Sequence, residues 1–475
     1  MKQLTSPWLK SLIGTFCLAT ALHSSAQTVK TLAVFDYANG AWPNAALVQG
    51  TDGNLYGMTQ INVFRMTPSG QITGLYTFCS TPDCRILQTT MSPLVRGRDG
   101  NLYGSTDYGE GLKGGTLFKI TPAGTYVLLN FPFGSTPNGL LQGVDGNLYG
   151  TTKYSSSLSG TVFKITLSGV LTTMYTFCAQ TNCADGLLPI GGLVQASDGN
   201  FYGTTYEGGA FSEGTVFKIT PTGTFTTLYT FCTQACLDGA HPMAGLVQGN
   251  DGYLYGTTSE GGTAGNGTIF KITLDGLLTT LYSFCVQTCS DGLHPTAALV
   301  QGSDGNFYGT TNGDVYCLGG SPNCGTLFQI TPSGAFTLLH TFCSVTLCAD
   351  GRAPDAPLLQ ATNGTFYGSD QLGGSSAYSQ CQIQSCGTMF GLSMGLRPFV
   401  EPTPAFGQPG TQIRILGTNL TGTTSVTFNG APAIFTVVSK KQIKAVVPSS
   451  ATSGWVQVTT PAGTLSSNAI FTVTP

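Results

Sequence analysis

The sequence predicts an all-β protein: a seven-bladed β-propeller closed by its N-terminal strand, followed by an immunoglobulin-like β-sandwich. Three observations carry this prediction. A phrase of thirteen residues recurs seven times, and each copy brings short runs rich in β-branched and aromatic residues. No segment shows a sustained helical period. Four antiparallel strands in a repeat of about 50 residues are typical of a propeller blade.

The recurring phrase is Leu-Val-Gln-x-x-Asp-Gly-Asn-Leu-Tyr-Gly-Thr-Thr. In the fourth copy the four runs cover residues 192–195, 200–205, 215–220 and 226–231, separated by Gly, Asp, Asn and Pro. The tyrosines lie in the middle of a predicted strand, so we expect them in the core between blades rather than on a sugar-stacking platform. They stand at Tyr56, Tyr103, Tyr149, Tyr202, Tyr255, Tyr308 and Tyr367.

The two ends of the array predict how the ring closes. Residues 31–37 match the fourth run of a repeat but precede the first copy, and the seventh copy ends after its third run at residues 388–393. Each run type occurs seven times only if the N-terminal strand completes the last blade. Such closure hides strand edges that would otherwise promote aggregation. We therefore assign residues 27–396 to the propeller.

The first 26 residues have the features of a secretory signal peptide. Lys2 and Lys10 bracket a short basic region, residues 11–22 are mostly apolar, and residues 24–26 are small enough for cleavage. No later run reaches the ~20 apolar residues of a transmembrane helix. We expect a secreted or cell-surface protein with no transmembrane segment after signal removal. Only 41 of 475 residues are charged, which argues against nucleic acid as a partner.

Fourteen cysteines follow the signal peptide and form seven close pairs. In an exported chain such spacing favours local disulfides, each closing one loop. Zinc is the competing interpretation, but a closed zinc site needs four ligands and each loop holds two. We predict disulfides and no metal. The pairs are Cys79/Cys84, Cys178/Cys183, Cys232/Cys236, Cys285/Cys289, Cys317/Cys324, Cys343/Cys348 and Cys381/Cys386.

The loop lengths predict two unlike faces. Connections after the second and fourth runs are long and hold all seven cysteine pairs, whereas those after the first and third runs are tight turns. Successive loops of an antiparallel blade alternate between its two ends. The long loops therefore share one face, called the stapled face below, and the tight turns share the other, the plain face. Binding function usually resides in elaborate loops on a rigid scaffold.

The repeat resembles the bacterial GloVer (Gloeo/Verruco) repeat family. The resemblance rests on the repeated Asp-Gly-Asn-Leu/Phe-Tyr-Gly-Thr-Thr and Gly-Thr-Val/Leu-Phe-Lys-Ile-Thr motifs and covers about residues 28–396. The seventh copy departs from the pattern with Asn363 in place of Asp. The resemblance implies an exported bacterial protein whose repeats are exposed outside the cell, and it brings no catalytic motif.

Residues 397–475 differ in pattern from the repeats. They contain short alternating strands divided by turns, which predicts a small β-sandwich. They resemble the IPT/TIG immunoglobulin-like domain through Ile-Leu-Gly-Thr-Asn-Leu, Val-Thr-Phe-Asn-Gly and Val-Val-Pro. This resemblance implies a spacer or binding unit of an extracellular protein.

An Asp-Gly-x-x-Pro motif in the long connections supplies the first candidate site. If the Leu-Val-Gln run is innermost, these loops approach the central opening, where carboxylates and imidazoles would suit a cation or a sugar. We favour the alternative, a turn followed by a proline that fixes entry into the strand, because the other copies place Leu188 and Ala353 at the histidine position. The candidates are Asp185, Asp238, His241, Asp291, His294 and Asp350.

Glu207 and Glu260 form the second candidate, at equivalent places after Thr-Thr in neighbouring copies. They would suit the acid pair of a glycosidase, although acids repeated by duplication are more often solvated loop residues. No motif for catalysis or for a cofactor occurs, and eleven of the seventeen aspartates stand directly before a glycine, as turn residues do.

These observations favour a non-enzymatic exported binding or cell-surface protein that needs no cofactor. We expect it to hold a glycan or an envelope protein on its stapled face. Two alternatives stay open: a secreted carbohydrate-active enzyme, either a lyase or a hydrolase, and a structural spacer at the cell surface.

Overall fold

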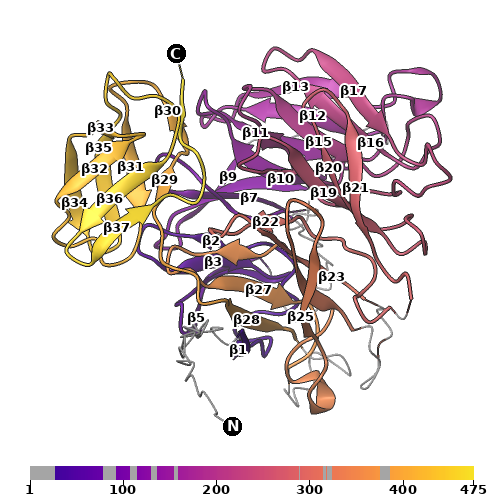
Figure 1. The fold of residues 1–475 in the computed structure, drawn as a ribbon, viewed down its shortest axis with the longest axis horizontal. Coiled ribbons are helices and arrows are strands. Elements are labelled where there is room, and N and C mark those ends of the chain that lie inside the picture. Colours follow the sequence, from indigo (N-terminus) through magenta and orange to yellow (C-terminus); the bar gives the residue numbers. More distant parts are fainter. Residues whose placement is uncertain are drawn as a thin grey trace, which may run out of the picture.

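The computed structural model describes residues 27–78, 92–106, 115–129, 136–154, 159–287, 289–313, 317, 324–374 and 386–474. These residues form seven four-stranded antiparallel sheets, numbered here as blades 1 to 7, and a β-sandwich (Figure 1). Their only helical segments are two short 3-10 turns, η1 (Thr181–Cys183) and η2 (Thr346–Cys348). Among them, no helix is long and apolar enough to cross a membrane. The all-β prediction is confirmed.

Blade 4 shows the arrangement that the other blades repeat. Its strands β14 (Val194–Gln195), β15 (Phe201–Thr205), β16 (Thr215–Ile219) and β17 (Phe225–Thr230) pair in chain order. The strands of blades 1, 2, 3, 5 and 6 are β2 (Val48–Gln49), β3 (Leu55–Met58), β4 (Asn62–Met66), β5 (Ile72–Thr77); β6 (Val95–Arg96), β7 (Leu102–Thr106), β8 (Thr116–Ile120), β9 (Tyr126–Leu129); β10 (Pro137–Gln142), β11 (Leu148–Thr152), β12 (Thr161–Ile165), β13 (Leu171–Thr176); β18 (Val247–Gln248), β19 (Leu254–Thr258), β20 (Thr268–Ile272), β21 (Leu278–Ser283); and β22 (Val300–Gln301), β23 (Phe307–Thr311), β24 (Thr326–Ile330), β25 (Phe336–Thr341).

Blade 7 joins the two ends of the array. It contains β26 (Leu359–Gln360), β27 (Phe366–Asp370) and β28 (Thr388–Ser393), and its fourth strand is β1 (Thr28–Val34). The strands β1 and β28 run antiparallel with Thr28 opposite Ser393, and they lie side by side in Figure 1. This is the pairing that the two ends of the sequence predict.

Hydrophobic clusters between neighbouring blades form the propeller core. The cluster between blades 4 and 5 contains Tyr202 from β15 and Leu254 and Phe270 from the next sheet. Seven such clusters occur among the described residues, and one of them joins blade 7 to blade 1 through Tyr367 and Leu55. The repeated tyrosines are therefore core residues, as the sequence predicts.

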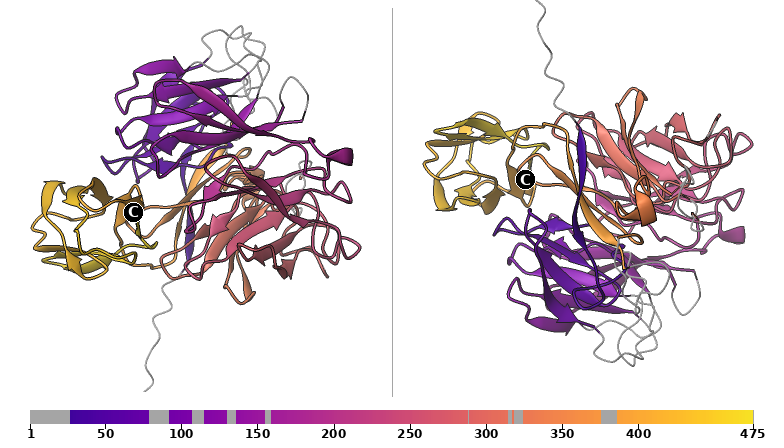
Figure 2. Two further views of the ribbon diagram at one scale, coloured as in Figure 1. Left: turned by 90° about the horizontal axis from the view of Figure 1, so that it is seen from above. Right: turned by 90° about the horizontal axis from the view of Figure 1, so that it is seen from below.

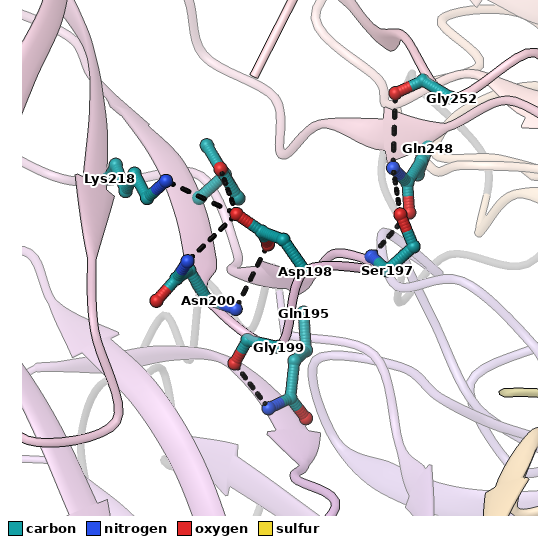
Figure 3. Close-up of polar contacts among 9 residues, drawn as sticks. Gln195, Ser197, Asp198, Gly199, Asn200, Lys218, Gln248 and Gly252 are labelled. Atoms are coloured by element: carbon teal, nitrogen blue, oxygen red, sulfur yellow. Dashed lines mark hydrogen bonds and ion pairs between the residues drawn. The ribbon is translucent and has the colours of Figure 1, made fainter. Parts of the chain in front are cut away.

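In six of the seven blades, a glutamine side chain clasps the inner strand to the turn of the preceding blade. Gln248 of β18 accepts a hydrogen bond at Oε1 from the backbone N–H of Ser197, 2.8 Å away, and donates from Nε2 to the carbonyl of Gly252, 3.1 Å away (Figure 3). Six glutamines accept in this way, and Gln49 closes the series by accepting from Thr362 of blade 7. The others are Gln142, Gln195, Gln248, Gln301 and Gln360. The Leu-Val-Gln strands are thus innermost.

The turn after each inner strand is built on its aspartate. Asp198 accepts hydrogen bonds from the backbone N–H of Asn200, 3.1 Å away, and from the hydroxyl of Tyr202, 2.8 Å away, and it pairs with Lys218 (Figure 3). Burial opposes ionisation of Asp198, but these hydrogen bonds lower its pKa below the ordinary value. The acids before glycine in these turns have the turn role that their position predicts.

Residues 400–473 form the β-sandwich. Its core includes Ile415, Val426, Ile443, Val458 and Phe471, all almost fully buried. One sheet has the order β29-β31-β35-β34, another the order β33-β32-β36-β37, and β30 pairs in parallel with β38. The bounds are β29 (Glu401–Thr403), β30 (Phe406–Gly407), β31 (Gln412–Leu416), β32 (Ser425–Phe428), β33 (Ala431–Pro432), β34 (Phe435–Ser439), β35 (Gln442–Val446), β36 (Val456–Thr460), β37 (Gly463–Ser466) and β38 (Thr472–Val473).

The sandwich packs on the plain face of the propeller (Figure 2). Blade 2 carries Arg96 where the other blades carry the clasp glutamine, and its guanidinium lies 2.7 Å from the carboxylate of Glu401. The backbone N–H of Phe399 donates to Thr362 in the inner turn of blade 7. Across the ring, the amide of Asn250 donates to the backbone of the sandwich. Because blades 2, 5 and 7 all take part, the sandwich spans the axis on this face.

We predict that Arg96→Gln loosens the sandwich from the propeller. The side chain of Arg96 is only 7% exposed, and loss of its charged hydrogen bonds should cost about 2 kcal/mol. In residues 27–475 with the Trp42→Phe change, Trp455 is the one remaining tryptophan. Its fluorescence reports on the sandwich, whose denaturant midpoint should fall. The exposed Lys440→Gln variant serves as the control. An unchanged midpoint in Arg96→Gln would contradict the assigned role.

We also predict that Asp370→Thr stabilises blade 7. Other blades pair two threonines here, such as Thr311 and Thr326, but Asp370 is fully buried and its Oδ1 has no hydrogen-bond partner. Burial raises its pKa well above the ordinary value, so the native state keeps the proton and loses stability as pH rises above about 4. The variant should gain about 1–3 kcal/mol at neutral pH.

The gain should grow between pH 4 and pH 8 in thermal unfolding experiments. The matched control is Thr311→Asp in blade 6, which should destabilise the chain with the same pH dependence. A gain that is equal at both pH values would mean that the carboxylate of Asp370 is not the cause.

Candidate functional site

Five disulfides close connections of the stapled face among the described residues. This agrees with the predicted pairing: four of these pairs follow an outer strand, and Cys317–Cys324 lies in the connection between β23 and β24. Cys79, Cys84 and Cys381 lie outside the described residues. The five described pairs are Cys178–Cys183, Cys232–Cys236, Cys285–Cys289, Cys317–Cys324 and Cys343–Cys348.

The aspartates of the Asp-Gly-x-x-Pro motif turn into their own loops. The Oδ2 atom of Asp238 accepts hydrogen bonds from the hydroxyl of Tyr229, 2.7 Å away, and from the backbone and hydroxyl of Thr233. Asp185 and Asp291 accept from Tyr175 and Tyr282 in the same way. In the next copy, Asp350 accepts from Ser344 and lies 3.4 Å from the ring of His340. This geometry favours the turn interpretation over a ring of ligands.

The residue before the proline has one backbone conformation in five blades. Its φ lies between 53° and 57°, in the left-handed region, although none of the five residues is a glycine. Such a conformation is uncommon for non-glycine residues and needs support from its surroundings. The loop therefore presents unlike side chains at one geometric position, and these are Trp42, Leu188, His241, His294 and Ala353.

His241 and its neighbours form the blade 4–5 cluster, which we define as Tyr206, Glu207, Glu213, His241 and Glu260. The imidazole stacks on Tyr206 with the ring centres 4.6 Å apart. Its Nε2 lies 2.9 Å from the carboxylate of Glu213 and 3.9 Å from that of Glu260. Its Nδ1 lies 3.0 Å from the backbone oxygen of Tyr206. Both ring nitrogens thus face oxygen acceptors.

The cluster concentrates acids around one phenol. Burial raises the pKa of Tyr206, and the charges of Glu260, Glu207 and Glu213 raise it further. The carboxylate of Glu260 is about half exposed, whereas that of Glu213 is 31% exposed. The site is therefore an open aromatic surface bordered by carboxylates.

The sequence-predicted residues meet only in part. His241 and Glu260 come together, while Glu213, which the repeat pattern does not single out, is the nearest acid to His241. In the next blade, His294 has no such acid partner among the described residues: its Nδ1 faces the backbone of Ser259, and Asn266 stands where blade 4 has Glu213.

A second polar group joins blades 6 and 7 and was not predicted. The carboxylate of Asp355 accepts a hydrogen bond from the hydroxyl of Thr296, 2.5 Å away, and a longer one from the amide of Asn312. Burial raises the pKa of Asp355 to about 6, against the opposing effect of the Thr296 bond. The sequence gives no repeat signal for Asp355, because the equivalent residue in the preceding blade is a threonine, Thr296.

Two family models match this chain, one over the repeats and one over the sandwich. The model of the Gloeobacter/Verrucomicrobia repeat matches residues 62–248 and 233–429. The chain belongs to the Gloeobacter/Verrucomicrobia repeat family. The IPT/TIG domain model matches residues 400–473 of this repeat protein. No curated protein matches it in sequence.

Solved structures resemble the repeat protein in fold. An extracellular domain attributed to a hybrid two-component system of B. thetaiotaomicron is 11% identical over 95% of this chain and 60% of that chain, with a TM-score of 0.50. A fungal alcohol oxidase of the AA5 family, in complex with copper, is 13% identical over 94% of this chain and 99% of that chain, with a TM-score of 0.49. At 11% identity the likeness to the extracellular domain shows the fold alone.

We predict that Asp238→Asn in this repeat protein opens its loop without touching the blade 4–5 cluster. An amide is a weaker acceptor for Tyr229 and Thr233, so the loop should lose about 1–3 kcal/mol of local stability. Hydrogen exchange of peptides spanning residues 231–239 should speed up. Asp275→Asn, at an exposed tight turn, should leave that exchange unchanged. Equal exchange in Asp238→Asn and the parent chain would contradict the turn role.

Proposed function

We propose that this chain is an extracellular binding protein that holds a glycan at the blade 4–5 cluster. The repeat family, the IPT/TIG domain and the disulfides fit a surface or extracellular binding protein. The finer assignment rests on one observation: the stack of Tyr206 and His241, bordered by Glu213 and Glu260 on the stapled face.

This arrangement has the chemistry that sugars require. The apolar face of a pyranose ring packs on aromatic rings, while its hydroxyls donate hydrogen bonds to carboxylates. A mixture of one aromatic surface and a few convergent polar groups is typical of small-ligand sites. The sandwich contacts described above lie on the plain face, which is consistent with its acting as a spacer and with binding at the stapled loops.

The competing function is carbohydrate cleavage. It would need one carboxyl group as acid and a second as nucleophile or base. Glu213 and Glu260 both face His241, so the imidazole competes with a sugar for their oxygens. We therefore propose glycan binding, and the experiment below also measures glycan cleavage.

We predict that the mature chain, residues 27–475, binds at least one class of glycan on an array. Tyr206→Ala should weaken binding about two- to tenfold, since stacking on one aromatic ring contributes roughly 0.5–1.5 kcal/mol. Tyr206→Phe should retain most of the affinity because the aromatic face stays. His294→Ala, at the position of the next blade that is equivalent to His241, is the control and should leave binding unchanged.

The same samples are assayed for release of reducing sugar from the bound glycan. Binding without release supports the proposal. If sugar is released and the release disappears in Glu213→Gln, the protein is a hydrolase and the binding proposal is wrong. If no glycan on the array is bound, the proposal is overturned in favour of an envelope protein as the partner.

A further inference from the structure

Blade 6 brings two cysteine pairs into one buried cluster. Cys317 and Cys324 belong to the connection between β23 and β24, and Cys343 and Cys348 to the connection after β25. Their residues are between 1% and 7% exposed, and they pack together as a group of their own. The sulfurs of Cys317, Cys324 and Cys343 all lie within 4.8 Å of one another.

The hairpin β24–β25 explains why the two pairs meet. Thr326 stands opposite Thr341 at its open end. The backbone N–H of Phe342 donates to Gly325, 3.0 Å away, and extends the pairing by one step. Cys324 and Cys343 come directly beyond this step on opposite strands, so their side chains emerge at the same end of the hairpin.

Other described blades lack one half of this arrangement. The position of Cys324 is taken by Glu213 in blade 4 and by Asn266 in blade 5, so the pairs that follow those blades' outer strands have no second pair beside them. In blade 7, Cys386 holds the position, but the connection after β1 contains no cysteine. In blade 6 two loops, each with two cysteines, converge, so four sulfurs lie together.

We propose that Cys317, Cys324, Cys343 and Cys348 form a redox-gated tetrathiolate site for zinc. In the oxidised chain, the four sulfurs are bonded in two disulfides and cannot bind a metal. Two molecules of a dithiol reductant give up four electrons and four protons in total and become cyclic disulfides, while both S–S bonds break and four thiols form. Zinc then binds the four thiolates and releases the four protons to solvent.

The geometry of the cluster suits this ion. Tetrahedral zinc with Zn–S bonds of about 2.3 Å places its sulfurs about 3.8 Å apart, a distance that sulfurs already within 4.8 Å can reach by small side-chain rotations. Two ligands on each side of a hairpin are a common source of structural zinc sites. Burial of all four residues would protect the bound ion from competing ligands in solvent.

A buried cation beside the cluster supports the same assignment. Zinc with four thiolates has a net charge of −2, which is costly to bury without a neighbouring positive charge. Arg352 is 9% exposed, and its guanidinium donates to the carbonyl of Cys317, 2.5 Å away. Among the described residues it forms no ion pair with a carboxylate, so its charge is available to offset that of the site.

The test compares oxidised and reduced mature chain for metal content. The chain is reduced with dithiothreitol, freed of reductant without oxygen, incubated with zinc and dialysed. We expect one zinc ion per chain after reduction and none in the oxidised chain. Cobalt in place of zinc should give the sulfur-to-metal charge-transfer and ligand-field bands of a tetrahedral thiolate site.

Cys343→Ser and Cys317→Ser, one from each loop, should each lose the zinc and the cobalt bands. The double variant Cys178→Ser, Cys183→Ser is the matched control and should keep both. Circular dichroism of the reduced chains shows whether each variant has folded, and loss of metal in either folded single variant supports the site. Reduced, folded parent chain without zinc, or equal zinc loss in the control, would overturn the proposal.

Discussion

The glutamine clasp is the interaction on which the rest of the structure depends. Each clasp joins a side-chain amide to the backbone of a neighbouring turn, and a single bond of this kind contributes about 1 kcal/mol. Its importance lies in its position, because it fixes the inner turn of one blade against the inner strand of the next. The first and last blades share the same clasp, since Gln49 accepts from Thr362 as Gln360 accepts from Ser303, 2.9 Å apart in both cases. The hydrophobic clusters fill the space between the sheets, and between blades 1 and 2 such a cluster forms without a clasp.

One departure from that series, Arg96 in blade 2, marks where the sandwich is attached to the propeller. Arg96 cannot accept a hydrogen bond, so blade 2 loses its clasp, but the guanidinium reaches out of the ring to Glu401 and Thr403. The break in the repeat is therefore the point at which the sandwich is attached. Because the attachment is on the plain face, the long loops with their disulfides remain the surface on which the repeats differ most from one another.

The parts of the structure that could be predicted are those that each repeat encodes locally. The strands recur in all seven copies and the aspartate turns in six, since the seventh has Asn363, so the copies reinforce one another. The pairing of β1 with β28 follows from the incomplete copies at the two ends of the array. The contacts of the candidate sites are different. His241 meets Glu213, Thr296 meets Asp355 and Cys324 meets Cys343 across a blade boundary or a hairpin end. The sequence suggests Glu207 and Glu260 as a pair because they occupy equivalent positions in neighbouring copies. Equivalent positions identify duplicated residues, but they do not show which side chains face each other between blades.

The residue before the proline of the Asp-Gly-x-x-Pro loops shows that one backbone conformation can carry side chains of different chemistry. Leu188, His241, His294 and Ala353 share the same left-handed backbone within a few degrees, so the backbone conformation is set by the surrounding loop and not by the side chain at that position. A leucine, an imidazole or a methyl group is then equivalent for folding but not for binding. Of these four residues, His241 is the one around which the described parts of the neighbouring loops add both an aromatic ring and acids. By the same reasoning, the functional residues of a repeat protein should be sought at positions where one copy differs in side chain but not in backbone from its neighbours. Both the blade 4–5 cluster and the four cysteines of blade 6 include such positions.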